Sequence, residues 1–334
     1  MKQSIFFRFY TLIFFVISLI ITTISGQPKK IVFAMTAEQE YQLNYIVLFA
    51  ESIKEFAGEY NDTETWVYTS FDTRDLSSEI LTSLAELNVT LKTIDVPEKA
   101  QWYYFASKAY AAVAAESEAL GNYDLLAWLN FDTVVLKEPA EFILPTGKNL
   151  GYRPVMHRNI GLGYKDKLDE FWARSFELMN VDESRVFPMV TPADQDTIKP
   201  YINAGCLIVR PERGIFKNWA DNFELLYKDV ALRKMCEQSI KQRIFIHQAA
   251  LTGTLLSYLN PDEYFELYEK VNYPLFFNEM FGSKKDFHDI TDVVTFRHEA
   301  FFNNPVEGWQ SLLKGKKEQL EWLINNLGKT GLKK

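Results

Sequence analysis

Buried strands that alternate with helices limit the possible folds of this chain more than any other feature. From Ile31 to Asp132, four short runs are almost entirely apolar, as fully buried strands are, and helical segments separate them. The strands are expected at 29–35, 64–70, 89–96 and 123–132, and the helices at about 38–57, 76–87 and 102–120. Continuous apolar strands between helices indicate a mostly parallel sheet with helices on both faces. We therefore predict an α/β fold in which residues 31–35 and 125–130 form neighbouring central strands.

The second half of the chain follows the same pattern more loosely. A further apolar strand is expected at 201–211, and helices at 168–179, 216–226, 231–242 and 312–327. The sequence contains no internal repeat and no long linker. We predict a single domain over residues 27–334, with the second half built onto the edge of the first.

The first 26 residues differ from the rest of the chain. Lys2 and Arg8 precede an uncharged apolar stretch that small residues follow, which is typical of a secretory signal peptide. The same length suits a single membrane anchor, which needs about 20 residues. Because the folded pattern already begins at Ile31, an anchored domain would lie directly against the bilayer. A cleaved signal is therefore favoured, and it would place the protein in the lumen of the secretory pathway (endoplasmic reticulum or Golgi) or outside the cell.

Two glycosylation sequons agree with a secretory location. They begin at Asn61 and Asn88 and fall in predicted loops, as in a glycoprotein. The chain contains two cysteines, Cys206 and Cys236, which are too few for a disulfide scaffold. Cys206 lies in an apolar strand and is expected to be a buried thiol. A net charge of −8 without a basic run disfavours nucleic acid as a partner.

A pair of polar residues ends the fourth predicted strand. Asn130 and Asp132 follow an apolar run, and alternate residues of a strand project to the same side. Buried polar groups are costly unless they are paired, so the two either stabilise the fold or face a ligand. In open parallel sheets, ligands bind at the carboxyl ends of the strands. The position of Asn130 and Asp132 therefore indicates a ligand site.

Four motifs in the same order resemble those of GT-A-fold glycosyltransferases that use nucleotide-diphosphate sugars, and most of all those of glycosyltransferase family 8. The resemblance extends from Ile31 to about Trp309. The matching segments are "WLNFDTVVLKEP", "YINAGCLIVRP", "IHQAAL" and "RHEAFFNNPVEGW". In the family, the first segment carries an Asp-x-Asp motif and the last carries a histidine before Gly/Pro-Trp.

The resemblance implies how a nucleotide sugar would be bound. Asp132 and His298 would hold Mn²⁺ or Mg²⁺ together with the donor diphosphate, since such cations prefer oxygen ligands and Mn²⁺ also accepts imidazole. The cation would neutralise charge as the bond between sugar and phosphate breaks. Lys108 would contact the donor, and Asn203 and Gly205 would line the sugar pocket.

Two positions depart from the family pattern. Asn130 replaces the first aspartate of Asp-x-Asp, although its amide can still hydrogen-bond a ribose hydroxyl and contributes to the expected donor site. His247 replaces the acid that usually precedes Gln248, and these two residues remain as candidate catalytic groups. Both replacements remove negative charge from the expected site.

Three functions stay open at this point. The first is a metal-assisted glycosyltransferase that moves a sugar from a nucleotide-diphosphate sugar to a hydroxyl of a glycan, protein or lipid. The second is a non-catalytic protein of the same fold that binds a nucleotide or a glycan. The third is a secreted interaction protein with a vestigial cleft. Asp132, His298 and Lys108 favour the enzyme, whereas Asn130 and His247 favour the binding protein.

Overall fold

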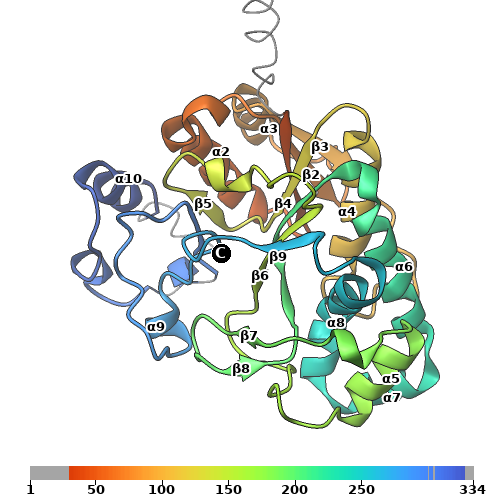
Figure 1. Cartoon of the computed structure of the whole chain (residues 1–334). Helices are drawn as coiled ribbons and strands as arrows, with labels where there is room; N and C mark the ends of the chain where they lie inside the picture. Colours follow the sequence, from red (N-terminus) through yellow and green to blue (C-terminus); the bar gives the residue numbers. More distant parts are fainter. Residues whose placement is uncertain (1–29, 300, 304, 328–334) are drawn as a thin grey trace, which may run out of the picture. The chain divides into compact units, whose positions relative to one another are not determined.

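A seven-stranded sheet forms the centre of the protein (Figure 1). The computed structural model describes residues 30–299, 301–303 and 305–327. The sheet has the order β3-β2-β1-β4-β9-β6-β10. These strands are β1 (Ile31–Ala37), β2 (Thr65–Thr69), β3 (Val89–Thr93), β4 (Leu125–Leu129), β6 (Leu150–Pro154), β9 (Ile202–Val209) and β10 (Tyr264–Glu266). β9 runs antiparallel to β4 and β6, and the other neighbouring pairs are parallel. The predicted α/β fold with a mostly parallel sheet is confirmed, and β1 and β4 are neighbours as expected.

Both faces of the sheet are buried because successive side chains of its strands enter different cores. On β1, Val32 and Ala34 pack on one side, while Phe33 and Met35 pack on the other. The first core contains α4 (Ala106–Ala119), α6 (Ile215–Lys228) and α8 (Ile240–Tyr258), and the second contains α2 (Gln42–Phe56) and α3 (Ser78–Glu86). This two-sided burial explains why the strands read as continuous apolar runs.

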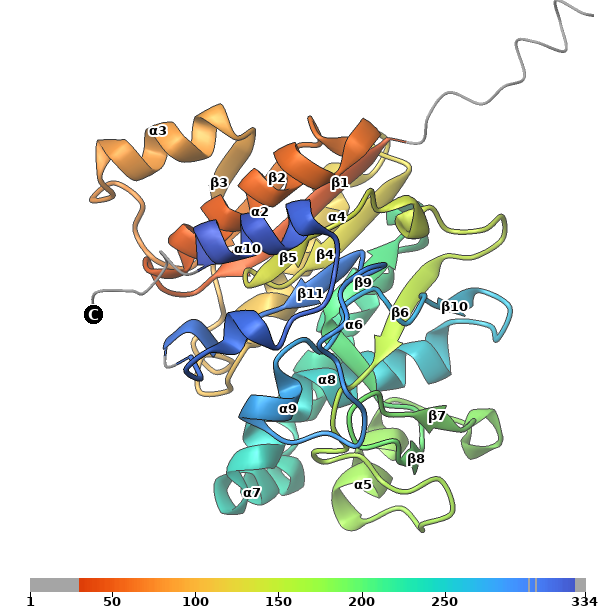
Figure 2. The ribbon, with the colours of Figure 1, turned by 90° about the vertical axis from the view of Figure 1, so that its left-hand side faces the viewer.

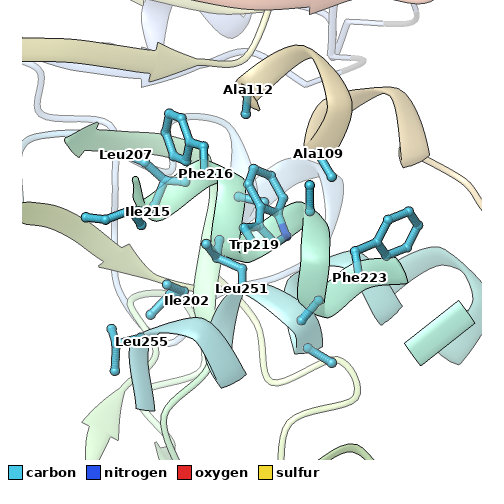
Figure 3. Close-up of a cluster of buried hydrophobic side chains, with 14 of the residues drawn as sticks. Ala109, Ala112, Ile202, Leu207, Ile215, Phe216, Trp219, Phe223, Leu251 and Leu255 are labelled. Carbon is cyan, nitrogen blue, oxygen red and sulfur yellow. The ribbon is translucent and has the colours of Figure 1, made fainter. Parts of the chain in front are cut away.

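Helix α6 is the centre of the first core. Its residues Phe216, Trp219 and Phe223 lie among side chains of α4, α8 and β9 (Figure 3). Trp219 is fully buried, and its indole nitrogen donates a hydrogen bond of 2.7 Å to the carbonyl oxygen of His247 on α8. The core therefore fixes the backbone of α8 at His247, a candidate catalytic residue of the sequence analysis.

Three helices differ from the sequence prediction. α4 begins at Ala106, four residues later than expected. The helix predicted at 231–242 is two helices, α7 (Val230–Gln238) and α8, because the Ser239 side chain caps α8 by accepting a hydrogen bond from the amide of Gln242. α10 (Lys317–Leu327) begins later than residue 312, since the backbone of Lys314 is hydrogen-bonded to residues 288 and 290.

A two-stranded ribbon lies beside the end of β4. It consists of β5 (Thr133–Val135) and β11 (Thr295–Arg297), which pair antiparallel with Arg297 opposite Thr133. The ribbon therefore brings the segment after residue 294 next to Asp132. Close by, α10 runs beside α2, with Phe56 and Trp322 in contact at 5.5 Å between ring centroids (Figure 2).

Short elements complete the described part of the chain. The remaining ones are α5 (Glu170–Leu178), α9 (Phe277–Met280), β7 (Met189–Val190), β8 (Thr197–Ile198), and 3₁₀ turns at Gly58–Tyr60, Ala140–Phe142, Glu183–Arg185, Pro211–Arg213, Phe301–Asn303 and Trp309–Ser311.

The structure bears on some of the features from which we predicted a secretory location. Cys206 is a buried free thiol as predicted, and Cys236 is also buried and free. Asn61 and Asn88 both lie in exposed turns, and their glycosylation stays a prediction. Across residues 30–299, 301–303 and 305–327, no helix has the length and apolar character that crossing a membrane requires. The predicted leader, residues 1–26, lies outside the described residues.

A buried carboxylate stabilises the start of α6. The Glu116 side chain on α4 is 4% exposed, and it accepts hydrogen bonds of 2.9 Å from the backbone amides of Phe216 and Lys217. We expect Glu116→Ala to lower the free energy of unfolding by about 1–3 kcal/mol, because the buried amide of Phe216 and the partly buried amide of Lys217 lose their acceptor. Glu118→Ala on the same helix is the control, since its half-exposed pair with Lys92 contributes at most about 1 kcal/mol. Urea unfolding measures both, and equal costs would contradict the capping role.

Candidate functional site

A cavity of about 440 Å³ opens at the carboxyl ends of β1, β4 and β6. This volume falls within the range of small-molecule sites, about 300–1,000 Å³. Every predicted donor-binding and catalytic residue lines it, namely Lys108, Asn130, Asp132, Asn203, Gly205, His247 and Gln248. His298, the second predicted metal ligand, is not part of the wall. The predicted donor-binding and catalytic residues thus lie together at one cavity, whereas His298 does not line it, and their roles stay predictions.

Asn130 is held between a cation and an anion. Its backbone amide donates to the carbonyl oxygen of Gly205 at 3.0 Å, which extends the pairing of β4 with β9 by one residue. Its side-chain oxygen accepts a hydrogen bond of 2.5 Å from Nζ of Lys108 on α4. Its side-chain nitrogen donates to Oδ1 of Asp132 at 3.1 Å. The amide thus connects the two charged residues, and its orientation is fixed by both.

Asp132 forms a forked ion pair with Arg297. Nε of Arg297 lies 3.0 Å from Oδ1 of Asp132, and Nη2 lies 3.3 Å from Oδ2. Nη2 also contacts the carboxylate of Glu299 at 3.0 Å. Sequence reasoning missed Arg297, which is 165 residues away from Asp132 along the chain. The available signal was its position directly before the predicted His298.

Burial and charge shift the pKa values of these groups. Burial lowers the pKa of Lys108 to about 8, and nearby Arg297 acts in the same direction. For Asp132, burial would raise the pKa, but Arg297, His298 and the hydrogen bonds from Arg297 and Asn130 together hold the pKa below the usual range. Burial raises the pKa of Glu299, with Arg297 opposing. The described wall of the cavity therefore places two cationic side chains beside one carboxylate that ionises readily.

His298 packs as a buried ring. It is 1% exposed, and its ring centroid lies 4.6 Å from that of Tyr45 and 5.5 Å from that of Phe302. Nδ1 donates to the carbonyl oxygen of Glu299 at 3.0 Å, and burial lowers the pKa of His298 to about 4. Nε2 has no hydrogen-bond partner among the residues that the structure describes. The imidazole is therefore neutral, with a free lone pair on Nε2.

His247 is also a neutral imidazole. It is 2% exposed on α8, and Nδ1 donates to the carbonyl oxygen of Ile244 at 2.9 Å. Burial, together with the charge of Lys108, lowers the pKa of His247 to about 3. Nδ1 carries the proton, so Nε2 can only accept a hydrogen bond. In this state His247 can accept a hydrogen bond from a hydroxyl, but it supplies no negative charge.

His157 lines another part of the cavity and is paired with a carboxylate that lies outside the wall. Nδ1 of His157 lies 2.6 Å from Oδ1 of Asp194, whose Oδ2 accepts from the amide of Arg158 at 2.7 Å. The His157 ring stacks on Phe277 at 5.4 Å between centroids, and Phe281 lies beside it. Sequence reasoning gave no role to His157, because no motif surrounds it. The pair joins segments 37 residues apart only in the folded chain.

Gly205 leaves space for the polar groups of the site. A methyl group at this position would lie 3.0 Å from Oδ1 of Asn203, 3.2 Å from Oδ1 of Asn130 and 3.3 Å from Nη1 of Arg297. If the cavity binds the nucleoside diphosphate that the family resemblance implies, Gly205→Ala should weaken this binding at least threefold, because three side chains that line the cavity must shift. The substitution should lower the free energy of unfolding by about 1 kcal/mol, since contacts at these distances relax by small movements. Titration calorimetry with a nucleoside diphosphate and urea unfolding measure the two effects, and unchanged binding would place the ligand elsewhere.

Comparisons with known proteins show to which family the chain is similar. Residues 32–256 match the family model described as the Rhodobacterales glycosyltransferase domain. A comparison with curated protein sequences finds no match.

Solved glycosyltransferase structures are similar at low identity. The apo form of mouse xyloside xylosyltransferase 1 is 13% identical with a TM-score of 0.47, covering 84% of this chain and 100% of its own. The galactosyltransferase LgtC with donor and acceptor sugar analogs is 13% identical with a TM-score of 0.44, covering 87% and 99%. Core-mannan synthase A from Aspergillus fumigatus, in its Mn/GDP form, is 7% identical with a TM-score of 0.45, covering 72% and 73%. Similarities at this level identify no substrate or cofactor for this chain.

Proposed function

The chain belongs to the Rhodobacterales glycosyltransferase domain family, and on this basis we propose that it transfers a sugar from a nucleotide-diphosphate sugar to a hydroxyl group of a glycan, a protein or a lipid. The observation that supports the donor class is the composition of the cavity wall. Lys108, Asn130 and Asp132 come from the first half of the chain, and Asn203 and Gly205 from β9. They meet at the edge of the sheet where open α/β folds bind ligands.

Each of these residues offers a suitable group for the donor. Lys108 supplies a positive charge for phosphate, and Asn130 and Asn203 supply amides for sugar or ribose hydroxyls. Gly205 permits close approach of a ligand to the backbone of β9. Gln248 on α8 adds a further amide to the wall beside His247. A charged diphosphate and a polar sugar thus find separate partners in the same cavity.

The predicted metal site does not fit a divalent cation in this arrangement. Both oxygens of Asp132 face the Arg297 guanidinium, and the amide oxygen of Asn130 is bound by Lys108. No cluster of three or more His, Cys, Asp or Glu suited to a metal occurs among the described residues. The free Nε2 of His298 favours a cation. We therefore assign no step of the proposed reaction to Mn²⁺ or Mg²⁺, and metal assistance stays a prediction of the family 8 resemblance.

The acceptor would reach the donor through the aromatic part of the wall. Phe277 and Phe281 lie beside His157, and Phe281 is 56% exposed. Aromatic rings provide flat apolar area, and the His157–Asp194 pair adds polar groups beside them. This mixed surface suits a hydroxyl-bearing acceptor. We propose that transfer takes place in the secretory pathway, with the predicted leader as signal peptide or anchor.

A panel of nucleotide sugars tests the proposal. The folded protein should show a raised melting temperature with the cognate donor, because a ligand that binds only the folded state stabilises it by mass action. Incubation with that donor and a mixture of acceptor glycans should release nucleoside diphosphate. Absence of a shift with every donor, with and without Mn²⁺, would contradict the proposal.

The second candidate is a non-catalytic binding protein. The observation that favours it is His247, a neutral ring where the family usually has an acid. A binding protein would show the thermal shift with a nucleotide or glycan, but no release of nucleoside diphosphate in prolonged incubations with acceptors. The same two measurements therefore separate the candidates.

A further inference from the structure

Arg297 occupies the charged centre of the cavity. Its guanidinium is 14% exposed and is held by Asp132 through Nε and Nη2, and by Glu299 through Nη2. These contacts leave Nη1, which makes no hydrogen bond to the described residues. Nη1 lies near Gly205, 3.3 Å from the position of an added methyl group. One edge of the guanidinium is thus anchored, while the Nη1 end remains available to a ligand.

Lys108 adds a second cation to the same cavity. It is 8% exposed, and its Nζ contacts the Asn130 oxygen at 2.5 Å and lies 4.7 Å from the centre of the Phe105 ring. Asn130 and Asp132 connect it to Arg297 through an unbroken chain of hydrogen bonds. A buried ammonium with a neutral amide as its close partner retains its attraction for an anion. The cavity therefore has two fixed positive groups, and both carboxylates of its wall, Asp132 and Glu299, contact Arg297 through Nε and Nη2.

We propose that Arg297, with Lys108, takes the place of a divalent cation, so that the protein binds the diphosphate of its donor without a metal. This inference rests on the proposed function. Nη1 can donate a charge-assisted hydrogen bond to a phosphate oxygen, and the guanidinium keeps its charge at all relevant pH values. It can neutralise charge on a leaving diphosphate as metal ions and lysine do elsewhere. The carboxylate of Asp132, released from metal binding, serves here to position the guanidinium.

The chemical balance of the transfer needs no further reactant. The bond between the anomeric carbon and the diphosphate oxygen breaks, and its electron pair stays on the departing nucleoside diphosphate. The acceptor oxygen forms the new bond to the anomeric carbon, and its proton passes to water. The negative charge that develops on the diphosphate is the charge that Arg297 and Lys108 would stabilise.

The test is titration calorimetry of the full folded domain with UDP, GDP and inorganic pyrophosphate, in EDTA and in Mn²⁺. We expect at least one of these probes to bind with dissociation constants that agree within twofold in the two buffers. Arg297→Gln should weaken binding in EDTA at least tenfold, and Arg297→Lys, which keeps the charge, should weaken it less. Arg174→Gln is the control, because Arg174 also pairs with two carboxylates, Asp229 and Glu177, but lies outside the cavity wall.

The outcomes separate this inference from the proposed function. Binding that EDTA weakens at least tenfold would overturn the metal-free mode and leave the glycosyltransferase proposal intact. Metal-free binding of equal strength in wild type and Arg297→Gln would overturn the role of Arg297. No binding of any probe in either buffer would overturn the proposed function itself. Because the wild-type comparison of EDTA and Mn²⁺ needs no variant, the test remains decisive even if Arg297→Gln fails to fold.

Discussion

Asp132→Ala is expected to lower the free energy of unfolding by about 3 kcal/mol, the lower end of the range for removing one partner of a buried ion pair. Asp132 is 2% exposed and engages Arg297 with both carboxylate oxygens. Without it, the guanidinium keeps only Glu299 as a counter-charge, and the Asn130 side chain loses an acceptor. Urea unfolding followed by circular dichroism measures the effect.

Two further variants show whether the cost comes from the stranded charge. Asp72→Ala removes one partner of an exposed ion pair with Arg74, and should cost far less stability than Asp132→Ala because solvent screens the pair. The double variant Asp132→Ala/Arg297→Met should be more stable than Asp132→Ala alone, because the uncompensated buried charge is gone. A double-mutant cycle without coupling between Asp132 and Arg297 would contradict the observed pairing.

The strands of the first half and the polar residues at the end of β4 could be predicted because local patterns determine them. Apolar runs on β1 and β4 required cover on both faces, and the chain satisfies this with α2 on one side and α4 on the other. Asn130 and Asp132 could be placed because they directly follow β4. These predictions needed only residues close together in the sequence.

The charge arrangement of the cavity could not be predicted in the same way. Arg297 contacts Asp132 because β5 pairs with β11. No sequence pattern in either strand predicts this pairing. The direction in which neighbouring side chains point also depends on it. His298 turns toward Tyr45 and Phe302, while Arg297 and Glu299 line the cavity. A family motif identified the segment, but its assignment of the metal ligand to His298 remains untested.

If Arg297 and Lys108 take the place of a divalent cation, as we propose, then a variant with one more carboxylate and without the guanidinium should bind such a cation. Asn130→Asp adds a carboxylate next to Asp132, and Arg297→Gln removes the guanidinium that covers Asp132. At an effective dielectric constant of 20, each unit of charge about 4 Å from a cation contributes about 4 kcal/mol. Two such changes exceed by far the 1.4 kcal/mol that corresponds to tenfold in affinity. The double variant should therefore bind Mn²⁺ at least tenfold more tightly than the wild type.

The single variants show which charge matters. In Asn130→Asp alone, the new carboxylate would pair with Lys108, whose Nζ lies 2.5 Å from the Asn130 oxygen, so that little Mn²⁺ affinity should be gained. Arg297→Gln alone frees Asp132 and Glu299 but leaves the Asn130 oxygen bound to Lys108, and hard cations prefer several oxygen ligands. Titration calorimetry of the four proteins with Mn²⁺, in the absence of nucleotide, measures the order. Wild-type binding as tight as that of the double variant would show that Arg297 does not exclude the cation, and the metal-assisted mechanism of the family resemblance would then be preferred.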